Sequence, residues 1–244
     1  MMFYLKSLPN LSSLTASLLD SQNDDFAYVY RIIFDLKPLR YLKLDASTYQ
    51  RLNLDLPIAV HGQFSSLEYL VIFHPIFLDE LAHLLSYASQ LSHFSCSNLI
   101  ESHYDMKFKE SIKSKNLEHL TIITHSLIFD RFQEFFTKLF LELTVLIMTI
   151  NDTVNSYLND SRWEYLITKH MPDLKKFVFR YNSVVNEGFQ IRSYHEFING
   201  SFEFLFPLLK EGLCAELISL EKRVDVRPFV RSFCLQILSI DGRW

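Results

Sequence analysis

The stretch Lys115-Asn116-Leu117-Glu118-His119-Leu120-Thr121-Ile122-Ile123 carries a three-residue apolar skeleton that the chain repeats. Its apolar members are Leu117, Leu120 and Ile122, so that the second and third are two residues apart. The skeleton occurs seven times, and the first residues of successive copies lie 24 to 31 residues apart. The copies are Leu11/Leu14/Ala16, Leu39/Leu42/Leu44, Leu67/Leu70/Ile72, Leu91/Phe94/Cys96, Leu117/Leu120/Ile122, Leu143/Leu146/Met148 and Leu174/Phe177/Phe179. Much of the chain is therefore built from one repeated unit.

The spacing within the skeleton predicts a strand, because residues two apart on a strand point to the same face. One strand and one helix with a single apolar side each cannot bury that side alone, whereas stacked units form a continuous core. A repeat of about 20 to 29 residues is typical of a leucine-rich repeat solenoid. We therefore expect an α/β horseshoe with parallel strands on its concave face and helices on its convex face. The alternative, a chance run of leucines in an ordinary core, would not hold one register seven times.

Apolar residues at helical spacing predict three helices between the strands. These lie within residues 77–89, 129–140 and 161–170, the last with Asp160 or Ser161 as its N-cap. Residues 44–63 are less regular and predict at most a short helix. Cys96, at an inward strand position, is expected to behave as a small apolar core residue.

The repeats divide the chain into two parts. Residues 1–184 are predicted to form a solenoid of about seven units, and residues 185–244 an irregular C-terminal cap of the same domain. The cap is expected to contain a helix at 202–220 and a strand at 233–240; a separate small domain is the alternative. No polar cap precedes Leu8, which suggests either a piece of a longer protein or an end masked by a partner.

Composition and charge disfavour several classes of protein. Of 244 residues, 49% are hydrophobic and 21% charged, and the net charge is −4. The densest basic stretch, 107–115, is interrupted by Glu110, whereas nucleic-acid binding needs a basic stripe, so no nucleic acid is expected. The most apolar window, 139–150, is too short to span a bilayer. Without a membrane span, a signal peptide or a disulfide framework among its three cysteines, the chain is predicted to be cytoplasmic or nuclear.

The sequence carries no motif for enzyme chemistry, so we expect a non-enzymatic protein without a cofactor. Five scattered glycines cannot build a phosphate-binding loop. His93 and His119 suggest a metal at first sight, but no Cys, Asp or Glu accompanies them in their column, so no metal is expected. The alternative is an enzyme or small-molecule binder with its site around Tyr194, His195 and Glu196.

The residues between the inward apolar positions are predicted to line the concave face. Exposed aromatic and apolar side chains that lie together mark interaction surfaces more often than enzyme pockets. This face is therefore predicted to bind another protein. The central residues are Tyr41, Tyr69, Phe73, His93, His119 and Ile123. The alternatives are that loops or the C-terminal region cover this face, or that the chain is a purely structural fragment without a partner.

The Leu-x-x-Leu-x-Leu units resemble the leucine-rich repeats of ribonuclease-inhibitor-like and F-box-associated intracellular proteins. The Asn that follows the motif in that family is present only as Asn151 and Asn182, while Trp163 to Ile167 and Pro172-Asp173-Leu174 resemble the helix and strand start of F-box/leucine-rich-repeat proteins. The resemblance implies the substrate-recognition part of an F-box-type ubiquitin-ligase adaptor. No F-box is seen, since Leu8-Pro9-Asn10 lacks its acidic residue, so cullin-type ligase subunits would be reached only through a module absent from this chain.

Overall fold

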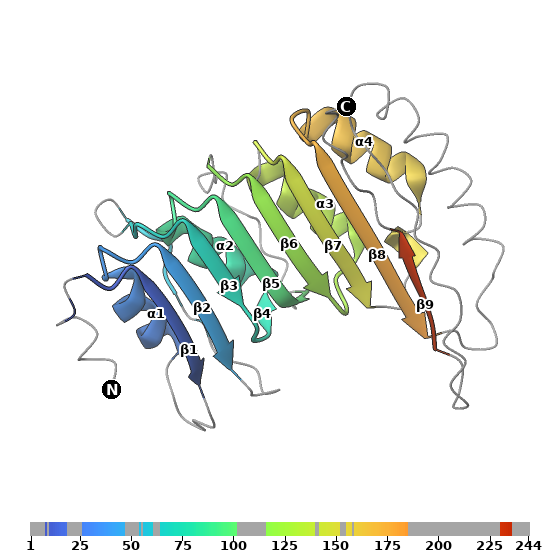
Figure 1. Cartoon of the computed structure of the whole chain (residues 1–244). Coiled ribbons are helices and arrows are strands. Elements are labelled where there is room, and N and C mark those ends of the chain that lie inside the picture. The colour runs from blue at the N-terminus through green and yellow to red at the C-terminus, as the bar shows by residue number, and fades with distance from the viewer. Residues whose placement is uncertain are drawn as a thin grey trace, which may run out of the picture.

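The computed structural model describes residues 8, 10–18, 26–46, 54, 56–60, 64–101, 116–139, 142–151, 155–157, 159–184 and 230–235. Within these residues the protein is α/β, with one sheet of mostly parallel strands and four helices (Figure 1). The strands are β1 (Ser13–Leu18), β2 (Tyr41–Ala46), β3 (Tyr69–Ile72), β4 (Ile76–Phe77), β5 (His93–Ile100), β6 (His119–Thr124), β7 (Val145–Asn151), β8 (Lys176–Val184) and β9 (Val230–Leu235). The helices are α1 (Phe26–Phe34), α2 (Leu78–Tyr87), α3 (Phe129–Leu139) and α4 (Asp160–His170), with a short 3-10 turn η2 (Asn155–Tyr157).

The strands lie side by side in the order in which they occur in the sequence. The order is β1-β2-β3-β5-β6-β7-β8-β9, and β4 extends the pairing of β5. Every pair from β1 to β8 is parallel, whereas β9 pairs with β8 in the antiparallel direction. Parallel neighbours need a crossover connection, and the intervening helices lie behind the sheet in Figure 1.

The predicted apolar skeleton keeps one register across the sheet, as the repeat predicts. Leu120 lies opposite Phe94 on one side and Leu146 on the other. The full row is Leu14, Leu42, Leu70, Phe94, Leu120, Leu146 and Phe177. From Leu42 to Phe177 these side chains are buried against the helices, while Leu14 on the edge strand is only partly buried. Burial of the apolar area of these side chains is the main stabilising contribution to such a fold.

A recurring backbone contact fixes where each strand begins. The carbonyl of Arg40 accepts hydrogen bonds from two consecutive N–H groups, those of Glu68 at 2.8 Å and Tyr69 at 3.0 Å. The same paired contact recurs at the carbonyls of Ser12, Arg40, Glu68, Ser92, Glu118 and Thr144. Because a one-residue slip would break this contact and turn the apolar row outward, the register is doubly specified.

Two predicted helices occur close to the expected positions, as α2 and α3. The third, α4, begins one residue before the predicted range, and its predicted cap is wrong. Asn159, not Asp160 or Ser161, is the N-cap: it has extended backbone angles, and its side-chain oxygen accepts the N–H of Arg162 at 3.2 Å. All three residue types suit a cap, so local sequence alone does not choose among them.

The helix α1 was not predicted, and it lies entirely outside the three expected helical ranges. Among the described residues of 44–63 there is no helix. The strand expected at 233–240 is found as β9, which begins three residues earlier at Val230; residues after Leu235 lie outside the described part, as does the expected helix at 202–220.

A cluster of aromatic side chains fills the space between α3, α4 and the last parallel strands. Trp163 of α4 contacts Phe129 edge to face at 5.0 Å and Phe177 at 5.0 Å, and its indole N–H donates to the Tyr157 carbonyl at 2.8 Å.

Cys96 is buried, as predicted, and burial raises the pKa of its thiol to about 12, so the thiol stays protonated. Among the described residues, no helix combines the length and the apolar character needed to cross a membrane.

Candidate functional site

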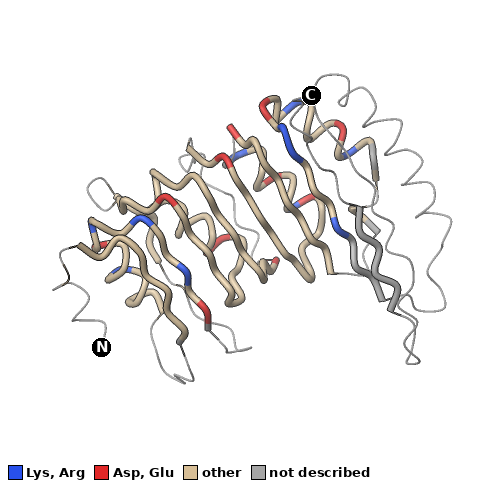
Figure 2. The backbone as a smooth tube through the Cα atoms, in the orientation of Figure 1, with Lys and Arg blue, Asp and Glu red and all other residues tan. Residues whose placement is uncertain are grey.

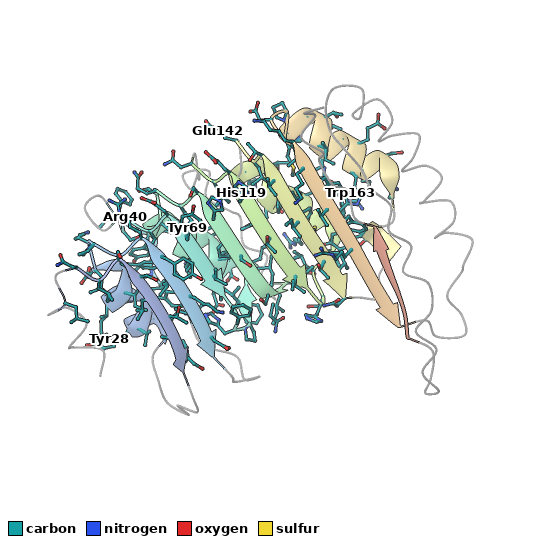
Figure 3. The ribbon with its side chains drawn as sticks, in the orientation of Figure 1. Tyr28, Arg40, Tyr69, His119, Glu142 and Trp163 are labelled. Carbon is teal, nitrogen blue, oxygen red and sulfur yellow. The ribbon has the colours of Figure 1, made fainter. Side chains whose placement is uncertain are left out.

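The sheet has one face packed against the helices and one face turned away from them, here called the open face (Figure 1). The residues that alternate with the buried apolar row point to the open face. Four of the six predicted site residues occupy its first row: Tyr41, Tyr69, His93 and His119. We call these four residues the ring ladder. Figure 3 labels two of them, Tyr69 and His119, near the starts of β3 and β6.

Parallel pairing places each ring of the ladder directly opposite the next. The ring centroids of Tyr41 and Tyr69 lie 6.4 Å apart, and those of Tyr69 and His93 lie 4.3 Å apart. The rings of His93 and His119 stack at 4.1 Å with an interplanar angle of 10°. Tyr69, His93 and His119 turn their ring faces to one another, whereas Tyr41 is tilted against Tyr69, so the stacked rings leave their edges and polar atoms uncovered by one another. The ladder therefore offers ring edges, phenol hydroxyls and imidazole nitrogens in one row across four strands.

The tautomer of His93 follows from its neighbours. The Ser92 hydroxyl donates to the Glu68 carbonyl at 3.1 Å, so its oxygen must accept from Nδ1 of His93 at 2.9 Å. In the neutral ring Nδ1 then carries the proton and Nε2 is an acceptor. Burial lowers the pKa of His93, the neighbouring His119 lowers it further, and Glu118 partly opposes both effects. His93 is therefore neutral at pH 7.

The other two predicted site residues lie farther along the strands. Phe73 follows β3 and is 42% exposed, with the Lys43 ammonium 5.0 Å from its ring centroid. It is four residues from Tyr69, or about 13 Å along an extended strand. Ile123 lies on β6, opposite the β5 bulge at 97–98 and two strands from Phe73. The structure thus brings four predicted residues into contact in one row, and places Phe73 and Ile123 apart at the far side of the same face.

Charge is absent from the middle of the open face. Within their bounds, β3, β5, β6 and β7 contain no Lys, Arg, Asp or Glu. The flanking strands differ: β2 carries Lys43 and Asp45, and β8 carries Lys176 and Arg180 (Figure 2). At the strand starts, Arg40 and Glu68 form an ion pair at 2.5 Å. The strands β3, β5, β6 and β7 therefore make an uncharged strip with charged borders, and we call this the central strip. It holds three residues of the ring ladder, while the fourth, Tyr41, lies on the β2 border.

The open face is not exposed throughout. Tyr69 is 40% exposed, whereas Val178 on β8 is 1% exposed although its position alternates with the buried row. Thr149 on β7 is also buried. Tyr69 and Phe73 are the most exposed of the predicted residues; Tyr69 is the first residue of β3, and Phe73 directly follows that strand.

Sequence reasoning missed two features of this site. Lys43, which lies between two inward apolar positions of β2, was not predicted as a site residue, although its ammonium lies 5.0 Å from the centroid of the Phe73 ring. Ser92, which fixes the His93 tautomer, precedes the strand and shows no signal in the repeat pattern. Among the described residues, no group of three or more His, Cys, Asp or Glu could hold a metal ion. The alternative site at Tyr194, His195 and Glu196 lies outside the described residues.

Comparisons with protein-family models, with curated proteins and with solved structures give no match to this chain.

Proposed function

We propose that the chain is a leucine-rich repeat protein whose strands line the concave side of a horseshoe solenoid. Support comes from the seven in-register copies of the skeleton and from the parallel strands that follow one another in chain order. Each unit of such an array contacts only its neighbours, and the array exposes one extended face.

On this basis the protein is a non-enzymatic interaction scaffold that binds a partner protein through the open face. The single observation that carries the proposal is the ring ladder, three of whose four members lie on the uncharged strands β3, β5 and β6. Tyrosine is enriched among the residues that dominate binding energy, and the core of a protein interface is depleted of charge. A face that binds nucleic acid would instead need a row of cations, which the central strip lacks.

The test compares two double variants of the purified chain. Tyr69→Ser with Phe73→Ser removes the two most exposed aromatic side chains of the open face. The matched control, Tyr28→Ser with Tyr165→Ser, removes two similarly exposed tyrosines from helices α1 and α4. Urea unfolding of each variant checks that the fold is retained.

We expect the wild-type chain and the control to capture the same partner from a cell lysate, identified by mass spectrometry. The open-face variant should capture at least about thirtyfold less, because losing one interface hot spot costs about 2 kcal/mol or more. Equal capture by all three proteins would reject the open face as the binding surface.

The repeat pattern also supports a narrower proposal, that the partner is a substrate of an F-box-type ubiquitin ligase for which this chain is the recognition part. Cullin-type subunits would then bind through a module that this sequence does not contain. Co-purification of the full-length gene product with a cullin adaptor subunit tests this. Partner capture through the open face without any ligase subunit would reject the ligase role and leave the scaffold role standing.

A further inference from the structure

We propose that His93 and His119 act as a pH-sensitive switch for partner binding on the open face. The partner binds while both imidazoles are neutral and is released when the pair takes up protons. This inference rests on the proposed function, because it concerns the same surface.

The geometry sets two titratable rings in direct contact. His93 and His119 stack at 4.1 Å, and Tyr69 stacks on the other side of His93 at 4.3 Å. On the far side of His119, register places Val145 of β7. Neither flanking side chain carries a counter-charge, so two imidazolium ions in this stack would repel each other strongly. A positive charge on one ring therefore disfavours protonation of the ring stacked on it.

The charged groups near the pair offer little compensation. Glu118 precedes His119, and its charge favours protonation of His93. On the β3 side, Glu68 is already paired with Arg40. Two strands from the pair on either side lie Lys43 and Asp45 on β2 and Lys176 and Arg180 on β8. Glu142 precedes β7 and Glu101 follows β5, while β3, β5, β6 and β7 have no charge within their bounds. Glu118 is the carboxylate that favours protonation of His93, and one carboxylate can stabilise only one imidazolium at a time.

The neutral pair also presents a defined hydrogen-bonding pattern. Because Nδ1 of His93 donates to Ser92, Nε2 is an acceptor for a donor group of the partner, such as a backbone N–H or a hydroxyl. Protonation turns this acceptor into a donor and puts positive charge into the otherwise uncharged central strip. The uncharged strip selects a partner that is itself uncharged there and that offers a hydrogen-bond donor. When His93 is protonated, this partner loses that hydrogen bond and meets a positive charge that binding would bury. The expected direction is therefore weaker binding in acid.

The first experiment examines the pair without a partner. The histidine rings of the full chain are titrated by nitrogen NMR from about pH 8 to pH 5, across the ordinary histidine pKa of about 6.5. We expect His93 to titrate below that ordinary value, because burial and the neighbouring His119 both lower its pKa. In His119→Gln, the pKa of His93 should rise, whereas in the control His125→Gln, at an exposed position after β6, it should not change. An unchanged His93 titration in His119→Gln would overturn the switch.

The second experiment measures binding with a defined probe. Peptides are selected from a random phage-displayed library on the immobilised full chain, and those that also bind Tyr69→Ser/Phe73→Ser are discarded. For wild type we expect the dissociation constant of a retained peptide to rise about tenfold or more between about pH 7.5 and pH 5.5. In His93→Gln/His119→Gln the change should be under about threefold. Near-ultraviolet circular dichroism at both pH values confirms that the chain stays folded.

The two proposals fail in different ways. If every selected peptide also binds the open-face variant, the proposed function is contradicted and the switch with it. If retained peptides bind wild type equally well at both pH values, the switch alone is overturned. A pH dependence that persists unchanged in His93→Gln/His119→Gln would likewise overturn it, because the histidine pair would not be its source.

Discussion

The Tyr30 hydroxyl donates a hydrogen bond to Nε2 of His74, with 2.7 Å between the two atoms, and both side chains are fully buried. The direction follows from the other ring nitrogen. Nδ1 of His74 lies 3.0 Å from the carbonyl of Pro75, which can only accept, so Nδ1 carries the proton and Nε2 accepts. This contact ties α1 to the chain just after β3, and it requires a neutral imidazole.

Removing the Tyr30 hydroxyl should destabilise the protein. Tyr30→Phe leaves Nε2 of His74 buried without its donor, and an unsatisfied buried polar group costs about 1–3 kcal/mol of unfolding free energy. Tyr28→Phe on the same helix is the control, since Tyr28 is 43% exposed and a surface change there should cost no more than about 0.5 kcal/mol. Urea unfolding at neutral pH measures both. Equal stability of the two variants would contradict the assigned hydrogen bond.

The same histidine predicts a loss of stability in acid. Burial lowers the pKa of His74, and the Pro75 carbonyl and Asp45 only partly oppose that shift. The unfolded chain, with a His pKa of about 6.5, then binds a proton before the folded chain does. The stability is therefore fully present above about pH 6.5 and falls as the pH drops toward the folded-state pKa. Urea unfolding at a series of pH values should show this slope.

His74→Gln is the matched variant, because its amide can still donate and accept but does not titrate. Its stability should fall less steeply with pH than that of wild type. A smaller slope should remain, since burial also lowers the pKa of His93 and His170. If the slopes of the two proteins are the same, His74 is not the source of the acid sensitivity.

The contrast between the strands and α1 shows what the sequence could predict. The apolar trios alternate with polar residues, and this alternation recurs in the same register in every repeat. It therefore predicts the repeat strands, which strands are neighbours, and the row of residues that forms the ring ladder. The α1 segment, Phe26-Ala27-Tyr28-Val29-Tyr30-Arg31-Ile32-Ile33-Phe34, is almost uniformly apolar and is buried at seven positions. A short run rich in β-branched and aromatic residues fits a strand as well as a helix, so periodicity alone could not place it.

The buried polar groups were also beyond the reach of the repeat pattern. His74 and Glu80 form hydrogen bonds with groups that are distant in sequence or belong to the backbone. The alternation of apolar and polar residues shows which face a side chain occupies, but it does not reveal such hydrogen-bond partners. For the same reason the sequence could place Tyr41, Tyr69, His93 and His119 in one row but could not show that their rings stack. The ring contacts depend on side-chain rotamers, which only the assembled sheet defines.

The buried carboxylate of Glu80 predicts a second stability effect. Its Oε2 accepts the N–H of Phe77 at 3.0 Å, at the start of α2, and its Oε1 accepts the N–H of Leu54 at 3.2 Å. Glu80→Ala would leave both donors without this acceptor and should lower the unfolding free energy by at least about 1–3 kcal/mol. Hydrogen exchange of the Leu54 and Phe77 amides should accelerate. Glu118→Ala, at an exposed carboxylate, is the control, and comparable stability of the two variants would refute this role of Glu80.

A neighbouring pair on β6 tests the assignment of the two faces. Leu120 is fully buried between Phe94 and Leu146, so Leu120→Ala should cost about 2–5 kcal/mol of unfolding free energy through lost burial and a residual cavity. Thr121, the next residue, points to the open face, and Thr121→Ala should cost no more than about 1 kcal/mol, the span of strand propensity. Urea unfolding compares the two variants directly. Were both to cost the same, alternation would not decide which side chains hold the sheet to its helices. The assignment of Tyr69, His93 and His119 to a face available for binding would then lose its physical basis, because it rests on the same alternation.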